Sequence, residues 1–335
     1  MRCLVSGGAG FIGSTLVDAL LARGDEVTVL DDFSTGRREN LEAALAAGAA
    51  LIERDIRERA TIVAAAETRP EVVFHLAAQM DVRKSVADPS HDAAINVGGT
   101  ANVLEAARLA GARRFVFASS GGAIYGEGEG REPPLGEAGP IEPLSPYGQS
   151  KHAGEGYVAL YRRLHGLAGV SLRLGNVYGP RQDPLGEAGV IAIYCGKLES
   201  GERPLVFGDG RQTRDYVFVS DVVAAMLAAA DATATGPVNV GTGVETDVLE
   251  LIERLGALDG TAGFEPEFAP ARPGEVQRIS IDPSRALAEL GWGARVGLDQ
   301  GLRLTLEDLA PGREVGEGAQ PDPLLAQLGA DLGAA

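Results

Sequence analysis

The sequence has few cysteines, a deficit of basic residues and no long apolar run, and each shortage excludes a class of protein. Only Cys3 and Cys195 occur among 335 residues, too few for a disulfide framework, so we expect a reducing, cytoplasmic location. Lys and Arg number 30 against 47 Asp and Glu, a net charge of −17, which argues against nonspecific nucleic-acid binding. No apolar run approaches the roughly 20 residues of a membrane span, and we expect neither a membrane segment nor a signal peptide.

Hydrophobic residues, in contrast, make up 45% of the chain, enough to bury a sizeable core. Strand-like and helix-like segments alternate along its first half. We expect strands at 3–6, 26–30, 49–53, 72–76, 115–118 and 170–174, and helices at 11–22, 93–109 and 146–165. Near-continuous apolar strands separated by helices are typical of a parallel sheet covered on both faces. The predicted fold class is therefore α/β, with a doubly wound parallel sheet.

The pattern changes after residue 174, where Gly, Pro and charged residues become frequent around one amphipathic helix near 190–200. A strand-then-helix pattern returns at 215–230, and 237–241 resembles another short strand. We predict a first domain at 1–174 that 215–241 rejoins, and a smaller, discontinuous α/β substrate-binding lobe at 175–214 and 242–312. The tail at 313–335 is rich in Gly, Ala, Pro and acidic residues, and we expect it to be poorly ordered.

A glycine-rich turn follows the first strand, where residues 7–13 read GGAGFIG. In this G-x-x-G-x-x-G spacing, glycines let the turn close and let the backbone approach a pyrophosphate at the helix N-terminus. The second strand ends in Asp31 and Asp32. An acid there can accept hydrogen bonds from both adenosine ribose hydroxyls and repels a 2′-phosphate. The sequence therefore predicts a Rossmann-type site for NAD rather than NADP, with Asp31 nearest the ribose.

A tyrosine and a lysine, Tyr147 and Lys151, are spaced i and i+4 on the helix predicted after the fifth strand. They share one helical face, and an ammonium beside a phenol favours the phenolate and lowers its pKa. Such a tyrosine can act as a general acid or base near neutral pH. The fifth strand ends in Ser119 and Ser120, which cannot both point inward from regular strand geometry.

These motifs together resemble the extended short-chain dehydrogenase/reductases. The stretches LRLGNVYGPR at 172–181, GDGRQTRDY at 208–216 and RPGE at 272–275 are similar to the nucleotide-sugar branch of that family, and within it to the UDP-glucose 4-epimerases. The resemblance covers roughly residues 1–310. It implies NAD as cofactor, a UDP-sugar as substrate, no metal, and a homodimer formed through the helices at 93–109 and 146–165.

The resemblance also implies a mechanism and a set of site residues. Tyr147 takes the proton of the sugar O4 while C4 passes a hydride to NAD. The 4-keto sugar then turns its other face, and the hydride and the proton are returned to it. Lys151 holds the nicotinamide ribose and keeps Tyr147 ionised. The expected catalytic residues are Tyr147, Lys151 and Ser120. The expected cofactor residues are Gly7, Gly10, Phe11, Ile12, Asp31, Asp32, Ser34, Gly36, Asp55, Ile56, Leu76, Ala77, Ala78, Gln79, Asn96, Ser119, Tyr147 and Lys151. The expected substrate residues are Ser120, Gly121, Asn176, Gly189, Val190, Val206, Phe207, Arg214, Arg272 and Glu275, in which the arginines would clamp the diphosphate.

One position departs from the family pattern. The family places a Ser or Thr four residues before the Tyr of its x-x-Y-G segment, and here Gly121 stands four before Tyr125. Ser120 is displaced by one residue, so its part in proton transfer stays open. Glycines at 121 and 122 would also enlarge the sugar pocket, and N-acetylated hexoses are therefore a further substrate hypothesis.

Three alternative functions each require residues that can be checked in the sequence. A 4,6-dehydratase needs an Asp-Glu pair where this chain has Gly-Gly-Ala at 121–123, which cannot perform acid–base chemistry. A UDP-glucuronate epimerase or decarboxylase needs a further cation near C6, for which Arg181 is a candidate. A non-catalytic NAD-binding regulator would typically lack the tyrosine and lysine pair, and both residues are present here.

Overall fold

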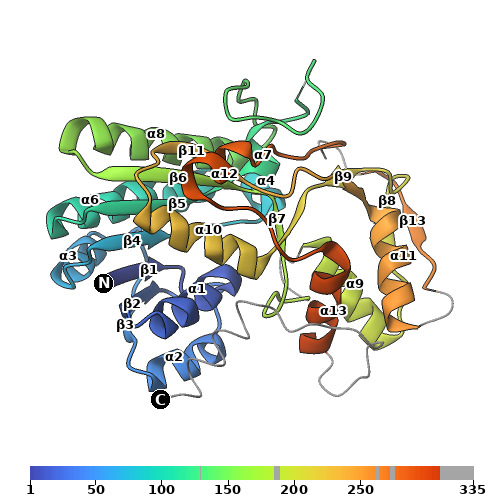
Figure 1. Cartoon of the computed structure of the whole chain (residues 1–335), viewed down its shortest axis with the longest axis horizontal. Coiled ribbons are helices and arrows are strands. Elements are labelled where there is room, and N and C mark those ends of the chain that lie inside the picture. Colours follow the sequence, from blue (N-terminus) through green and yellow to red (C-terminus); the bar gives the residue numbers. More distant parts are fainter. Residues whose placement is uncertain (129, 185–188, 261–263, 272–275, 310–335) are drawn as a thin grey trace.

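A parallel sheet of seven strands forms the centre of the larger part of the molecule (Figure 1). The computed structural model describes residues 1–128, 130–184, 189–260, 264–271 and 276–309. The strand order is β11-β6-β5-β4-β1-β2-β3, and each neighbouring pair is parallel. The strands are β1 (Arg2–Ser6), β2 (Glu26–Asp31), β3 (Ala50–Glu53), β4 (Val72–His75), β5 (Arg114–Ser120), β6 (Ala168–Leu174) and β11 (Gly236–Val240). The order reverses at β1, where such sheets bind ligands beyond the strand ends.

Helices cover both faces of this sheet (Figure 1). The elements along the larger part are α1 (Phe11–Ala22), η1 (Arg38–Leu41), α2 (Glu42–Ala46), α3 (Arg59–Glu67), α4 (Val82–Ala87), α5 (Pro89–Ala93), η2 (Ala94–Gly99), α6 (Thr100–Ala110), α7 (Gly121–Ile124), α8 (Pro146–His165), α10 (Val219–Asp231) and α12 (Ser284–Leu290). Apolar side chains of α1 and α10 form one core with the sheet, and those of α3, α6 and α8 form another. Successive side chains of a strand point to opposite faces, so a continuous apolar run gives the strand two apolar faces. The predicted doubly wound fold is confirmed.

The predicted helix at 93–109 differs in the structure. Asp88 caps a turn that begins at Pro89, since its carboxylate accepts from the His91 N–H at 2.9 Å. The chain then passes through the π-helical segment η2 before α6 continues to Ala110. Asn96, within η2, is 2% exposed. Local cap chemistry, which an apolar pattern does not report, sets this earlier start.

A smaller lobe lies beside the sheet, with its own apolar core (Figure 1). It contains the helices α9 (Val190–Ser200), α11 (Val248–Asp259) and α13 (Leu298–Leu309). Short strands pair within or next to it: β7 (Asn176–Tyr178) with β10 (Tyr216–Phe218), β8 (Leu205–Phe207) with β13 (Glu267–Ala269), and β9 (Thr213–Arg214) with β12 (Thr246–Asp247). The predicted domain boundaries remain a prediction, and the tail at 313–335 lies outside the described residues. None of the described helices is long and apolar enough to cross a membrane.

Candidate active site

The glycine-rich loop between β1 and α1 has a shape that only glycines allow. Gly7 has φ +74°, and a Cβ on it would lie 2.6 Å from the backbone nitrogen of Ala77; a Cβ on Gly13 would lie 2.0 Å from the oxygen of Gly7. Helix α1 begins after Gly10 with no side-chain cap and no acidic residue in its first turn. The amide N–H groups of its first turn can donate to a pyrophosphate. Phe11 and Ile12 lie in this turn and are half-buried. The residues present therefore fit a dinucleotide.

The carboxylate of Asp31 at the end of β2 closes this loop. One oxygen accepts from the Ala9 N–H and the other from the Phe33 N–H, both at 2.9 Å. Burial raises the pKa of Asp31, and the backbone N–H bonds oppose that shift. Asp32 is exposed and bonds only its own turn among the contacts described, at Ser34. Asp31 is thus placed at the strand end where a ribose would lie, as its position in the sequence predicts, and its ribose contact stays a prediction.

The ends of β3 and β4 continue the same edge of the sheet. Leu76, Ala77 and Ala78 are half-buried beyond β4. Asp55 is held by Arg57 at 2.8 Å, and this hydrogen bond lowers the pKa of its carboxyl. Other expected cofactor residues contact the protein itself. Ile56 packs against Gly99, and Gly36 packs against Ala9 and Asp31. Gln79 and Asn96 are hydrogen-bonded to each other, and Ser119 donates to Glu155. The structure therefore brings the expected cofactor residues to one edge, several of them as a supporting layer.

Tyr147 and Lys151 lie on the first turns of α8, which Ser145 caps by accepting from the Gly148 N–H at 3.1 Å. Tyr147 is partly buried and is hydrogen-bonded to Ser120 at the end of β5. The ammonium of Lys151 is buried, donates to the carbonyl oxygen of Ala118 at 2.8 Å, and lies 5.9 Å from the centre of the Tyr147 ring. Ser120 thus reaches the phenol despite its displacement by one position.

The charges around this pair differ from the expectation. Burial raises the pKa of Tyr147 to about 12, and the hydrogen bond with Ser120 opposes part of that rise. Burial also lowers the pKa of Lys151 to about 8. The expectation that Lys151 lowers the phenol pKa is therefore wrong for this arrangement of side chains, because desolvation dominates and the ammonium bonds a carbonyl instead of the phenol oxygen.

Gly121 does not enlarge a pocket, which corrects a second expectation. A Cβ on Gly121 would lie 2.8 Å from Cδ1 of Ile281 and 3.3 Å from the oxygen of Arg173. The space beside it is therefore filled by apolar packing. A Cβ on Gly122 would lie 3.2 Å from Oδ1 of Asn176, so Gly122 lies against one of the expected substrate residues.

The smaller lobe carries the remaining substrate candidates. Val206 is fully buried in its core, whereas Phe207 is half-buried. Gly189 and Val190 form the uncapped start of α9, and Arg214 donates to the Thr213 carbonyl at 2.8 Å. Arg272 and Glu275 lie outside the described residues.

Arg181, the candidate cation for binding a sugar carboxylate, is bonded to two aspartates of the protein. Its guanidinium donates to Asp18 of α1 at 2.7 Å, and its backbone N–H donates to Asp308 at 3.0 Å. Within the described part of the chain, no group of three or more His, Cys, Asp or Glu side chains could hold a metal ion.

Two buried polar clusters next to α8 were not anticipated from the sequence. Glu155 accepts from Ser119 and from Arg173, and Asp92 bonds to Ser150, one residue before Lys151. Glu155 follows Lys151 by four residues, as Lys151 follows Tyr147, so the helical spacing could have indicated it. No comparable local signal distinguishes Asp92.

Residues 3–241 match the NAD dependent epimerase/dehydratase family. A curated UDP-glucose 4-epimerase of Mycolicibacterium smegmatis is 49% identical over 309 residues, which cover 92% of this chain and 98% of that protein. The solved UDP-glucose 4-epimerase of Thermotoga maritima with UDP-glucose has 42% identity and a TM-score of 0.89, covering 92% of this chain and 98% of that one. The structure of the Thermus thermophilus UDP-glucose 4-epimerase complex with NAD has 44% identity and a TM-score of 0.86, covering 93% and 100%.

Proposed function

The chain belongs to the NAD-dependent epimerase/dehydratase family, and from this premise we propose that it interconverts UDP-hexoses by inverting C4, with NAD as its cofactor. The family resemblance predicted from the motifs is confirmed. One observation carries the proposal in particular: Tyr147, hydrogen-bonded to Ser120, and the buried ammonium of Lys151 lie together at the end of β5. This is the edge of the sheet at which the glycine loop fits a dinucleotide.

The residues of this chain divide the work as follows. The N-terminus of α1 and the glycine loop would hold the pyrophosphate, and Asp31 would accept from the adenosine ribose. When bound, oxidised NAD would supply the hydride acceptor and a positive charge, and a positive charge in the site favours the phenolate of Tyr147. Tyr147 then takes the proton from O4 of the hexose and returns it after the sugar has turned its other face. Ser120 donates to the phenolate and keeps it aimed at O4.

Two finer points remain proposals about this chain. Arg214, with Arg272 beyond the described residues, would hold the diphosphate while the sugar turns, which places binding energy in the remote part of the substrate. We also propose a cytoplasmic homodimer that serves hexose, including galactose, metabolism. The homodimer would form through the helices at 93–109 and 146–165, and exposed apolar side chains on α6 and α8 support this: Leu109 is 53% and Leu164 is 65% exposed. Light scattering should then give twice the 34.7 kDa chain mass.

Incubation with sugar nucleotides tests the function. The purified protein is given UDP-glucose, UDP-N-acetylglucosamine or UDP-glucuronate without added reductant, and the products are separated. Formation of UDP-galactose supports the proposal, whereas conversion of UDP-glucuronate alone would replace it with the glucuronate-directed alternative. Formation of UDP-N-acetylgalactosamine would show that the site admits the larger sugar. Tyr147→Phe serves as the inactive control.

A further inference from the structure

The carboxylate of Asp92 is completely buried beneath the catalytic helix, with an exposure of 0%. Its Oδ1 accepts from Gln79 Nε2 and from Asn96 Nδ2, both at 3.0 Å, and its Oδ2 is 2.6 Å from Ser150 Oγ. These three partners come from the segment after β4, from η2 and from α8. Asp92 therefore joins the cofactor edge of the sheet to the helix that carries the acid–base pair.

Both neighbouring amide groups are oriented so that they donate to the carboxylate of Asp92. Gln79 Oε1 accepts from the Asp81 N–H at 2.6 Å while its Nε2 donates to the Asp81 carbonyl. Asn96 Oδ1 accepts from the Gln79 N–H at 2.9 Å while its Nδ2 donates to the Gln79 carbonyl. Each amide must therefore present an N–H group to Oδ1 of Asp92. An ionised carboxylate accepts hydrogen bonds at both oxygens, and it satisfies these two donors and the Ser150 hydroxyl together.

A buried carboxylate is stabilised by such hydrogen bonds and by a positive charge nearby, and Lys151 follows Ser150, the bonded residue, directly on α8. Lys151 is 4% exposed, and the negative charge of Asp92 opposes the desolvation that lowers its pKa. The same charge raises the pKa of Tyr147. From β4, His75 faces this cation as a neutral ring, because burial and then Lys151 hold its pKa at about 3. Glu155, farther along α8, is neutralised by Arg173.

We propose that Asp92 is a positioning residue for the acid–base pair: its buried charge holds Lys151 as an ammonium ion, and its hydrogen bonds fix α8 to the cofactor edge. The inference rests on the proposed function in one respect, namely that Tyr147 and Lys151 perform the proton transfer. Two substitutions in this cluster separate the effect of the Asp92 charge from the effect of its hydrogen bonds.

Asp92→Asn removes the charge and keeps the contacts. The amide oxygen can accept from Gln79 and Asn96, and the amide nitrogen can donate to the Ser150 hydroxyl, which accepts as well as donates. Ser150→Ala does the reverse, since it removes one contact and leaves the charge. Asp221→Asn is a matched control, because Asp221 is another buried carboxylate, bonded to the N–H groups of Arg295 and Val296 on the opposite face of the sheet.

Loss of a nearby negative charge lowers the pKa of a lysine and of a tyrosine alike. The profile of kcat against pH should therefore move as a whole in Asp92→Asn, with both limbs at lower pH. The expected shift is about 1 pH unit, which is the lower end of the range by which a nearby charge shifts a pKa. NAD content should stay unchanged. Ser150→Ala and Asp221→Asn should keep both limbs in place. A purely structural role of Asp92 would lower the rate without moving either limb.

A second readout does not depend on turnover. The phenolate absorbance of the holoenzyme is titrated in each variant, and the same titration of the matching Tyr147→Phe double variant is subtracted. The Tyr147 transition should fall by the same pH interval in Asp92→Asn. Asp92→Ser, which also removes the charge, replaces it if the asparagine variant does not fold. An unmoved phenolate transition overturns the inference, even in an active enzyme; absent epimerisation with a shifted transition overturns only the proposed function.

Discussion

The buried pair of Glu155 and Arg173 allows a quantitative test of what holds α8 against the sheet. The side chains are 8% and 4% exposed, and the carboxylate accepts three hydrogen bonds. Oε1 accepts from Ser119 Oγ at 2.7 Å and from Arg173 Nε at 2.9 Å, and Oε2 accepts from Arg173 Nη2 at 2.8 Å. Glu155→Gln retains only one acceptor oxygen. Because Arg173 donates to both positions, the new amide N–H group must face a guanidinium N–H group in either orientation.

The expected cost follows from burial. Breaking a buried ion pair by removing one partner costs about 3–5 kcal/mol, because the other charge stays desolvated. A stability of about 5–15 kcal/mol is typical of a folded protein, so this loss is a large share of the total. We expect Glu155→Gln to lower the free energy of unfolding by this amount, measured by urea denaturation with saturating NAD and followed by circular dichroism.

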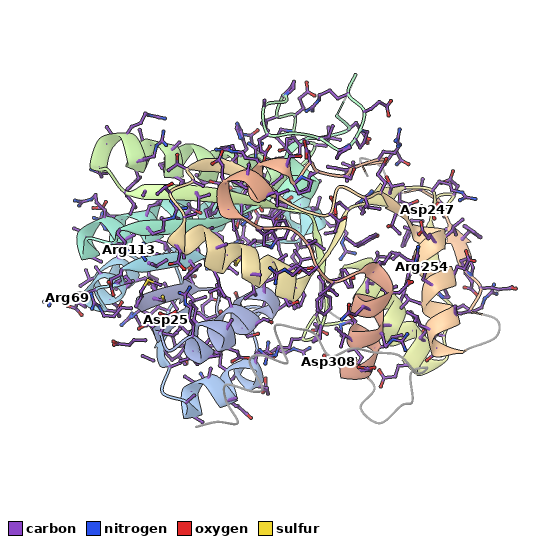
Figure 2. All side chains as sticks on the ribbon, in the orientation of Figure 1. Asp25, Arg69, Arg113, Asp247, Arg254 and Asp308 are labelled. Atoms are coloured by element: carbon purple, nitrogen blue, oxygen red, sulfur yellow. The ribbon has the colours of Figure 1, made fainter. Side chains whose placement is uncertain are left out.

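The smaller lobe offers a matched control in Glu250→Gln. Glu250 also accepts from Nε and Nη2 of one arginine, Arg254, at 2.9 and 2.7 Å, although both hydrogen bonds end on its Oε1. Arg254 lies on the outer helix α11 (Figure 2), and the two side chains are 39% and 38% exposed. Exposed pairs of this kind contribute about 0.3–0.5 kcal/mol. Equal losses in the two variants would refute the reasoning, since burial would then have no influence on the cost.

Four further outcomes follow from the same geometry. Tyr147→Phe should abolish epimerisation with NAD content unchanged in the purified protein, and near-normal turnover would contradict the assigned acid–base role. Ser120→Ala should slow kcat within the roughly 10²–10⁴-fold range of an assisting proton-transfer group; an unchanged kcat would leave Ser120 a structural role only. Gly7→Ala should be purified without NAD, because its Cβ would lie 2.6 Å from Ala77 N at φ +74°, and retained NAD would show that the loop can shift. Burial lowers the pKa of His75 from 6.5 to about 3, so between these pH values the unfolded chain binds a proton that the folded protein does not. The stability present above pH 6.5 should therefore be lost as pH falls towards 3, by about 1.4 kcal/mol per pH unit. His75→Gln should lose less stability than the unchanged protein in urea titrations between pH 6.5 and 5.

Much of the fold could be predicted from the sequence because its signals are local. Helix α8 begins and ends where predicted, since Ser145 and Pro146 form its start and Gly166, with φ +72°, forms its end. The strands β1, β2 and β4 to β6 were found within a few residues because apolar runs of that length are buried on both faces. The cofactor site was predictable for the same reason, since the glycine loop and Asp31 sit at strand ends close together in the sequence.

What the sequence could not supply depends on contacts between distant segments. Asp92 bonds Ser150 across 58 residues, and neither residue is distinctive in its own neighbourhood. The phenol pKa failed as a prediction because helical spacing reports that two side chains share a face, whereas burial and the Ala118 carbonyl decide which charge state is favoured. The pocket expected at Gly121 failed because Ile281 comes from a segment 160 positions later.

The end of β5 shows why the displaced serine is compatible with the proposed chemistry. Side chains of a strand alternate between its faces, and here three successive residues meet three different neighbours. Ser119 donates to Glu155 of α8, Ser120 reaches the Tyr147 phenol, and Gly121 packs against Ile281. A hydroxyl at 121 would therefore have to displace Ile281 before it could approach a sugar. Since Gly121 also begins the short helix α7, the strand ends at Ser120, and this is the last position from which a side chain of β5 can serve the acid–base pair.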